Sequence, residues 1–191
     1  SKELFTMPNI FPFSLMNRFI IKILNTLYFT FTNSGTRLTS IEKFFYPLDN
    51  IKNWNYIYGN KGFISYQCSL PNKNSYKSIY EILETIRKYQ TYSFVSVLKS
   101  LGRKNTPLSF GQNGFTLVFD FPNYKNILKI LNKLNQIVLR YNGKIYLAKD
   151  SIIDKKEFKK INNEFYDYKF RSFRKKIDYY FSSLQSKRLD L

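Results

Sequence analysis

The segment 62–70, which reads GFISYQCSL, constrains the fold most strongly because its apolar and polar side chains alternate. Successive side chains of a β-strand point to opposite faces, so this alternation predicts a strand with two different faces. One face holds the apolar residues Ile64, Tyr66, Cys68 and Leu70. The other face holds Phe63, Ser65, Gln67 and Ser69. We expect the first face to lie in the core and the second to meet solvent or a ligand pocket.

The order of the neighbouring segments predicts the architecture around this strand. Segments 93–100, 115–121 and 144–148 also have strand-like sequence. One helix is predicted over 76–89, and a second follows Asn123, which we expect to cap it. The apolar stripes of the two helices are Tyr76, Ile79, Leu83 and Ile86, and Leu128, Leu131, Leu134 and Val138. The order strand-helix-strand-strand-helix-strand predicts an α+β fold with a mostly antiparallel sheet and helices on one face.

Helices are also predicted at both ends of the chain. Segment 13–31 carries apolar residues at helical spacing, namely Met16, Phe19, Ile20, Ile23, Leu24 and Leu27. Arg18 and Lys22 argue against a membrane span, so this is an amphipathic helix that packs on a core or touches anionic lipid. Near the other end, Asp154 and Glu157 predict a capping box for a basic helix, and a second basic aromatic helix ends near Leu191.

The composition excludes several classes of function. The chain has 31 Lys and Arg against 13 Asp and Glu, which gives a formal charge of +18. Such a charge favours phosphate-bearing partners or an anionic membrane, but abundant Lys, Asn, Ile, Tyr and Phe also fit AT-rich coding drift, so we expect no nucleic-acid partner. No histidine is present, which excludes a Ser-His-Asp triad and His metal sites. The single Cys68 excludes an internal disulfide, and a chain that begins at Ser1 is expected to be a fragment or a processed product.

Charged residues stand at or near the ends of three predicted strands. Lys99, Asp120 and the pair Lys149-Asp150 occupy these positions. A single charge at a strand end is usually a solvated turn residue. Gln67 differs because it lies in mid-strand, where a buried amide is costly without a hydrogen-bond partner. From the residues alone, the chain is a basic α+β module with one polar strand face.

Four motifs together point to a family. The segments 44–71, 93–110, 114–122 and 143–151 contain FFYPLDNIKNWNYIYGNKGFISYQCSLP, SFVSVLKSLGRKNTPLSF, GFTLVFDFP and GKIYLAKDS. In this order and spacing they resemble the C-terminal half of the decaprenylphosphoryl-β-D-ribose 2′-oxidase family of FAD-linked oxidases, which are flavoproteins of the vanillyl-alcohol-oxidase type.

The resemblance implies a two-domain organisation and a reaction. Residues 1–143 would form the substrate-binding domain, and residues 144–191 would complete an FAD-binding domain whose N-terminal part has no counterpart here. The enzyme would oxidise the C2 hydroxyl of a polyprenyl-phosphate-linked ribose to the 2-keto sugar, with FAD as cofactor and a keto-reductase as partner, in cell-wall arabinan synthesis. The resemblance also implies a cytoplasmic location with possible peripheral attachment to the membrane that holds the lipid substrate.

The resemblance assigns roles to individual residues. Lys149 matches the family's active-site lysine, expected near both the flavin and the sugar, so it is the catalytic and cofactor-contacting candidate. Lys99 and Gln67 match residues that line the substrate site. The other substrate-site candidates depart from the family pattern: Ser65 replaces a glutamine, and Thr116 and Val118 replace an asparagine and a cysteine.

Two alternatives remain open. A sugar or aldonolactone oxidase of the same flavoprotein class would fit the fold, although such enzymes carry a His-Trp-x-Lys motif and this chain has no histidine. The second alternative is a non-enzymatic basic module that binds nucleic acid or an anionic membrane, for which steeply salt-dependent binding is expected.

Overall fold

The structure is a computed structural model that describes residues 5–10, 12–32, 35–36, 38–46, 48–102, 110–161, 165–177 and 180–191, with the backbone alone for 165–170. Its central element is a four-stranded sheet in the order β4-β5-β3-β6, and every neighbouring pair is antiparallel. The strands are β3 (Phe63–Pro71), β4 (Ser96–Leu101), β5 (Gly114–Pro122) and β6 (Lys144–Ile145). The predicted antiparallel sheet is therefore confirmed.

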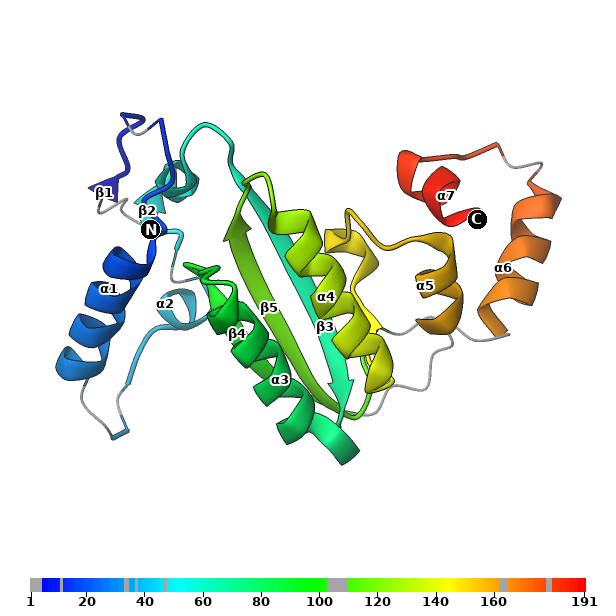
Figure 1. Ribbon diagram of the computed structural model, residues 1–191, viewed down its shortest axis with the longest axis horizontal. Coiled ribbons are helices and arrows are strands. Elements are labelled where there is room, and N and C mark those ends of the chain that lie inside the picture. Colours follow the sequence, from blue (N-terminus) through cyan, green and yellow to red (C-terminus); the bar gives the residue numbers. More distant parts are fainter. Residues whose placement is uncertain are drawn as a thin grey trace.

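Two helices cover one face of the sheet, as predicted. α3 (Ser75–Lys88) and α4 (Ile127–Arg140) lie next to each other on the same side of β3 and β5 (Figure 1). Between the helices and the sheet is the main core, which includes the predicted apolar face of β3 through Tyr66, Cys68 and Leu70. The α+β class and the layer arrangement therefore agree with the sequence prediction.

The structure corrects details of both helices. In α3 the residue buried against the sheet is Ile82, whereas Tyr76 and Leu83 of the predicted stripe are exposed. Ile79 and Ile86 of the predicted stripe do pack against the core, so the buried face is the one that carries Ile79, Ile82 and Ile86. α4 begins later than predicted, after Asn126, whose side chain makes no capping hydrogen bond. The backbone N–H of Asn123 instead donates to Gly62 O, 3.0 Å away, so Asn123 belongs to the preceding turn.

The predicted strand 144–148 is also wrong over most of its length. Only Lys144 and Ile145 pair with β3, opposite Ser69 and Cys68. The chain then leaves the sheet as a short 3-10 helix, η3 (Leu147–Lys149). The turn formed by η3 places Lys149 beyond the edge of the sheet rather than at the end of a strand.

The predicted N-terminal helix is present but packs on a core only near its start, where Ile21 contacts the small cluster of Met16, Ile57 and Tyr58. α1 (Arg18–Phe31) begins after Asn17, whose Oδ1 accepts hydrogen bonds from the backbone N–H of Phe19 and Ile20 at 3.0 Å. None of its residues is buried. The predicted packing on a core therefore holds only for the first turn of α1, and the rest of its apolar side chains are exposed. Nearby elements are β1 (Phe5–Thr6), α2 (Ile41–Phe45), β2 (Ile51–Lys52) and η1 (Trp54–Tyr58).

The C-terminal segment forms short helices at the opposite end of the molecule from α1 (Figure 1). These are α5 (Lys155–Ile161), α6 (Phe165–Lys176) and α7 (Leu184–Leu189); the remaining short element, η2 (Asn72–Asn74), links β3 to α3. The predicted capping box at α5 is confirmed, because Glu157 N donates to Asp154 Oδ1 and Asp154 N donates to Glu157 Oε2. In the described part of the chain, no helix is long and apolar enough to cross a membrane.

Candidate functional site

The sheet face turned away from α3 and α4 gathers five of the six predicted site residues. Strand register pairs Ser65 with Asp120, Gln67 with Val118, and Lys99 with Thr116. Directly paired residues of antiparallel strands point to the same face. We call the face that carries these six residues, together with Ser69, the polar face. Residues far apart in sequence, on β3, β4 and β5, thus form one surface, which the sequence pattern of any single strand could not establish.

A hydrogen-bond chain occupies the middle of the polar face. Gln67 Nε2 donates to Thr116 Oγ1 at 3.2 Å, and Thr116 Oγ1 donates to the carbonyl oxygen of Cys68 at 2.8 Å. Thr116 is buried and Gln67 is half-buried. The mid-strand amide thus has the partner that the sequence required, and Thr116 holds it in place. No described residue donates a hydrogen bond to the side-chain carbonyl oxygen of Gln67, so that oxygen can accept one from a ligand.

One end of the polar face carries a buried carboxylate. Asp120 is only 8% exposed, and its Oδ1 accepts a hydrogen bond from Ser65 Oγ. Among the described residues, no cation pairs with this carboxylate. The Tyr58 hydroxyl donates a hydrogen bond to the backbone carbonyl oxygen of Asp120 at 3.0 Å. Burial, together with the charge of Asp120, raises the pKa of Tyr58 above its ordinary value. Ser65, which replaces a glutamine of the family pattern, therefore has a hydrogen-bond partner, Asp120, that the sequence did not indicate.

The other end of the polar face is positive. Lys99 on β4 is exposed and pairs across the sheet with Thr116. In the same cross-strand row, Ser69 pairs with Thr116 on one side and with Lys144 of β6 on the other. Lys99 on β4 and Lys144 on β6 stand at the two ends of this row. They are roughly three strand spacings apart, and each spacing is about 4.8 Å. An anion would therefore be attracted to the Lys99 and Lys144 end and repelled from the Asp120 end.

Lys149 reaches this region through the turn after β6 rather than through the sheet. Tyr146 N donates to Gln67 O at 2.9 Å, and Lys149 N donates to Tyr146 O at 3.0 Å. These two bonds tie the η3 turn to the central strand beside Gln67. Lys149 is half-buried, and its ammonium group has no ion-pair partner among the described residues. Lys149 therefore lies in a turn that is held beside the strand of Gln67.

A buried ion pair holds the η3 turn from behind. Asp150 Oδ2 accepts from Arg188 of α7 at 2.6 Å, and the Asp150 side chain is 1% exposed. Asp150 Oδ1 accepts from the backbone N–H groups of Ile152 and Ile153, and Gln185 Nε2 donates to Leu147 O at 2.7 Å. Asp150 therefore holds the turn that carries Lys149 in place. The sequence did not predict its partners, because Arg188 lies in a different helix.

The residues just before β5 cover part of the polar face, which sequence reasoning did not predict. Ser69 Oγ donates to Phe110 O at 2.9 Å, and Gln112 Nε2 donates to Ser69 O at 3.0 Å. The Phe110 ring packs against the ring of Tyr146, with centroids 4.8 Å apart. Ser69 is consequently buried rather than open to a ligand. Segment 103–109, which precedes Phe110, lies outside the described residues.

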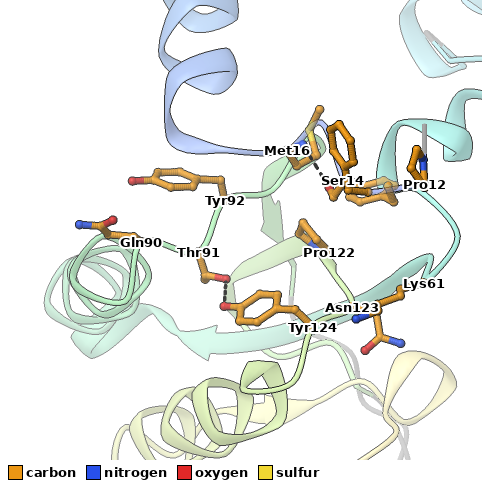
Figure 2. Close-up of a pocket in the computed structure, with 12 residues that line it drawn as sticks. Pro12, Ser14, Met16, Lys61, Gln90, Thr91, Tyr92, Pro122, Asn123 and Tyr124 are labelled. Carbon is orange, nitrogen blue, oxygen red and sulfur yellow. Dashed lines mark hydrogen bonds between the residues drawn. The ribbon is translucent and has the colours of Figure 1, made fainter. Parts of the chain in front are cut away.

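A separate cavity of about 360 Å³ lies at the Asp120 end of the sheet, away from Lys149. Figure 2 shows its polar floor, where Thr91 and Tyr124 share a hydrogen bond of 2.6 Å, below Gln90 and Tyr92. None of the six predicted site residues lines it. The cavity is therefore not the site that the motifs indicate.

The described residues fit only part of an FAD site. Lys149 can stand beside a flavin ring as an unpaired cation at the edge of a polar surface. A dinucleotide pyrophosphate, however, is usually held by a glycine-rich loop that opens a helix, and no described helix begins in this way. Nor do the described residues contain a cluster of His, Cys, Asp or Glu that could hold a metal ion. A flavin would need further binding groups from outside the described structure.

Comparison with known proteins confirms the resemblance indicated by the motifs. The chain is 34% identical, over 153 residues, to a decaprenylphosphoryl-β-D-ribose oxidase of Mycolicibacterium smegmatis. The match covers 78% of this chain and 33% of that protein, so the chain spans about a third of the length of this relative. No protein-family model matches the chain.

Proposed function

We propose that this chain is the substrate-binding part of an FAD-dependent oxidoreductase that oxidises the C2 hydroxyl of a polyprenyl-phosphate-linked ribose to the 2-keto sugar. The match to an oxidase of decaprenylphosphoryl-β-D-ribose supports the class of reaction. The observation that carries the proposal is the register, because it brings the motif residues Gln67, Lys99 and Thr116 to one face beside the Lys149 turn.

The charges of the polar face suggest how the substrate lies on it. The phosphodiester would bind near Lys99, where lysine ammonium groups attract phosphate oxygens. The sugar would then lie over Gln67, whose free carbonyl oxygen can accept a hydrogen bond from a hydroxyl. Asp120 would keep the phosphate away from the opposite end by charge repulsion. Thr116 and Val118 would set the shape of the floor between these ends.

Lys149 would act on the reacting hydroxyl. As an ammonium group it can donate a hydrogen bond to the C2 oxygen and stabilise the negative charge that develops there while the hydroxyl proton passes to solvent and the C2–H bond breaks. When bound, FAD supplies the hydride acceptor. The Asp150–Arg188 pair and the Tyr146–Gln67 hydrogen bond would keep Lys149 in place, so the ammonium group need not reorganise during the reaction.

The proposal requires a second part that binds FAD. Residues 1–143 would form the substrate domain and residues 144–191 would return to the FAD-binding domain, and the product would pass to a keto-reductase. Without the FAD-binding part, the 191-residue chain should bind flavin weakly and should not turn over. A purified chain that is yellow and active on its own would contradict this organisation.

The role of Lys149 is tested in the complete enzyme, with FAD bound, by rapid mixing with substrate in the absence of oxygen. We expect Lys149→Ala to slow flavin reduction by at least about a hundredfold, because one pre-organised donor to a developing oxyanion contributes this much. Lys129→Ala is the matched control, since Lys129 is an exposed lysine on α4. Near-normal flavin reduction in Lys149→Ala would remove Lys149 from the reaction.

A further inference from the structure

The N-terminal helix α1 presents the most unusual surface of the described structure. Of its 14 residues none is buried, although most are apolar. Its exposed large apolar side chains, here called the α1 apolar surface, are Phe19, Ile23, Leu24, Leu27, Tyr28, Phe29 and Phe31. An exposed apolar surface of this extent on a globular protein normally meets a partner or a membrane.

The contact of α1 with the rest of the chain is confined to one side near its start. Ile21 packs against the small core formed by Met16, Ile57 and Tyr58, and Ile20 is half-buried. Beyond these residues the helix extends from the body of the molecule, at the end farthest from α5–α7 (Figure 1). The nearby helix α2 repeats the pattern, with Ile41, Phe44 and Phe45 all exposed. The rest of the described chain therefore leaves the α1 apolar surface and these three side chains of α2 uncovered.

The charges on α1 indicate which partner covers it. Arg18 and Lys22 line a hollow of about 500 Å³ together with Phe19, Ile23 and Leu27, so cations and apolar side chains share one surface. α1 contains no Asp or Glu, and neither of its two cations has an ion-pair partner among the described residues. An anionic lipid offers both matching groups, a phosphate for the cations and acyl chains for the apolar residues.

We propose that α1 lies in the surface of an anionic membrane, with the α1 apolar surface in the acyl region and Arg18 and Lys22 at the lipid phosphates. At 14 residues α1 is too short to span a bilayer, which fits an orientation in the plane of the membrane. The proposal rests on the described surface of α1 and is independent of the proposed oxidation.

Flotation with lipid vesicles tests the proposal. The 191-residue chain should float with phosphatidylcholine vesicles that contain about a third phosphatidylglycerol, and much less with phosphatidylcholine alone. Leu27→Glu should lower the bound fraction at least about tenfold, because it places a charge where an apolar side chain enters the acyl region. Leu128→Glu is the matched control: Leu27 and Leu128 are both 48% exposed and both lie on 14-residue helices.

Removal of charge provides an independent test. Arg18→Gln and Lys22→Gln should each weaken binding to the anionic vesicles roughly fivefold at low salt, and Lys129→Gln on α4 should have no effect. Equal loss from all three changes would mean that only the overall charge of +18 attracts the vesicles, and would overturn the assignment to α1.

The same experiment distinguishes the other occupants of α1. If the FAD-binding part covers α1, the 191-residue chain floats but the complete enzyme does not, and the proposal fails. If a second copy covers it, gel filtration shows a dimer that Leu27→Glu converts to a monomer, without binding to vesicles. Flotation of the complete enzyme that depends on Leu27, Arg18 and Lys22 would support the proposal, whether or not the enzyme oxidises a ribose lipid.

Discussion

α1 and α4 are both 14-residue amphipathic helices, but the rest of the chain buries residues of α4 and none of α1. α4 buries seven residues, and five of them belong to the sheet core, namely Ile127, Leu131, Leu134, Ile137 and Val138. α1 buries none. Apolar spacing therefore shows that one face of a helix is made to be covered, but it does not show what covers it. For α4 the cover is the sheet of the same chain; for α1 it has to come from outside the described structure.

The largest expected difference between the two helices is in stability. Leu134→Ala on α4 should lower the free energy of unfolding by about 2.7–5 kcal/mol, because it leaves a cavity in a fully buried site. The measurement is urea unfolding of the 191-residue chain, followed by circular dichroism. A loss below about 1 kcal/mol would mean that α4 is not packed as the structure describes.

The pH dependence of stability tests how deeply Cys68 is buried in the core beneath α4. Burial raises the pKa of the Cys68 thiol from an ordinary value of 9.0 to about 12. Above pH 9 the unfolded chain releases this proton but the folded chain does not, so stability falls as the pH rises from 9 towards 12. At pH 10 the loss from this group is about 1.4 kcal/mol.

The comparison that isolates this effect is Cys68→Ala against the unchanged chain. Urea unfolding at pH 7.5 and at pH 10 should show a smaller pH-dependent loss of stability in the variant. Both proteins carry the same tyrosines, so the difference between them reports Cys68 and its charge effect on the neighbouring Tyr66. Identical pH dependence in the two proteins would show that Cys68 is accessible to water.

The smallest expected effect is on α1 itself. Leu27→Ala should change the free energy of unfolding by no more than about 0.5 kcal/mol, as for other exposed positions. The same urea titration as for Leu134 gives this value. A loss comparable to that of Leu134→Ala would break the contrast between the helices, because Leu27 would then be packed against the protein in solution.

The sequence predicted those features that depend on local alternation or on the spacing of motifs. Alternation in β3 correctly separated Tyr66, Cys68 and Leu70 from Ser65 and Gln67. The order of strand-like and helical segments along the chain predicted the mostly antiparallel sheet and the helices on one face, but not the strand order in the sheet. The family motifs then selected residues that the register brings to one surface, including Lys99 from an edge strand.

Features that depend on distant contacts could not be predicted. Segment 144–148 reads as a strand, but only its first two residues find a partner on β3, and Asp150 is fixed by Arg188, 38 residues away. Ser69 looks open in the alternation, yet Phe110 covers it. The Ser65–Asp120 hydrogen bond became visible only with the register. In each case a second segment decides the outcome, and no local pattern encodes which segment that is.

The central claim is that the polar face and Lys149 form the substrate surface of a flavin-dependent oxidase. The most direct measurement is the anaerobic addition of a polyprenyl-phosphate-linked ribose to the complete, FAD-loaded enzyme, with the flavin spectrum and the sugar product both followed. The account predicts that the oxidised flavin is bleached and that one 2-keto sugar forms for each flavin reduced. A flavin that stays oxidised with this lipid, but is reduced by a free sugar or an aldonolactone, would contradict it.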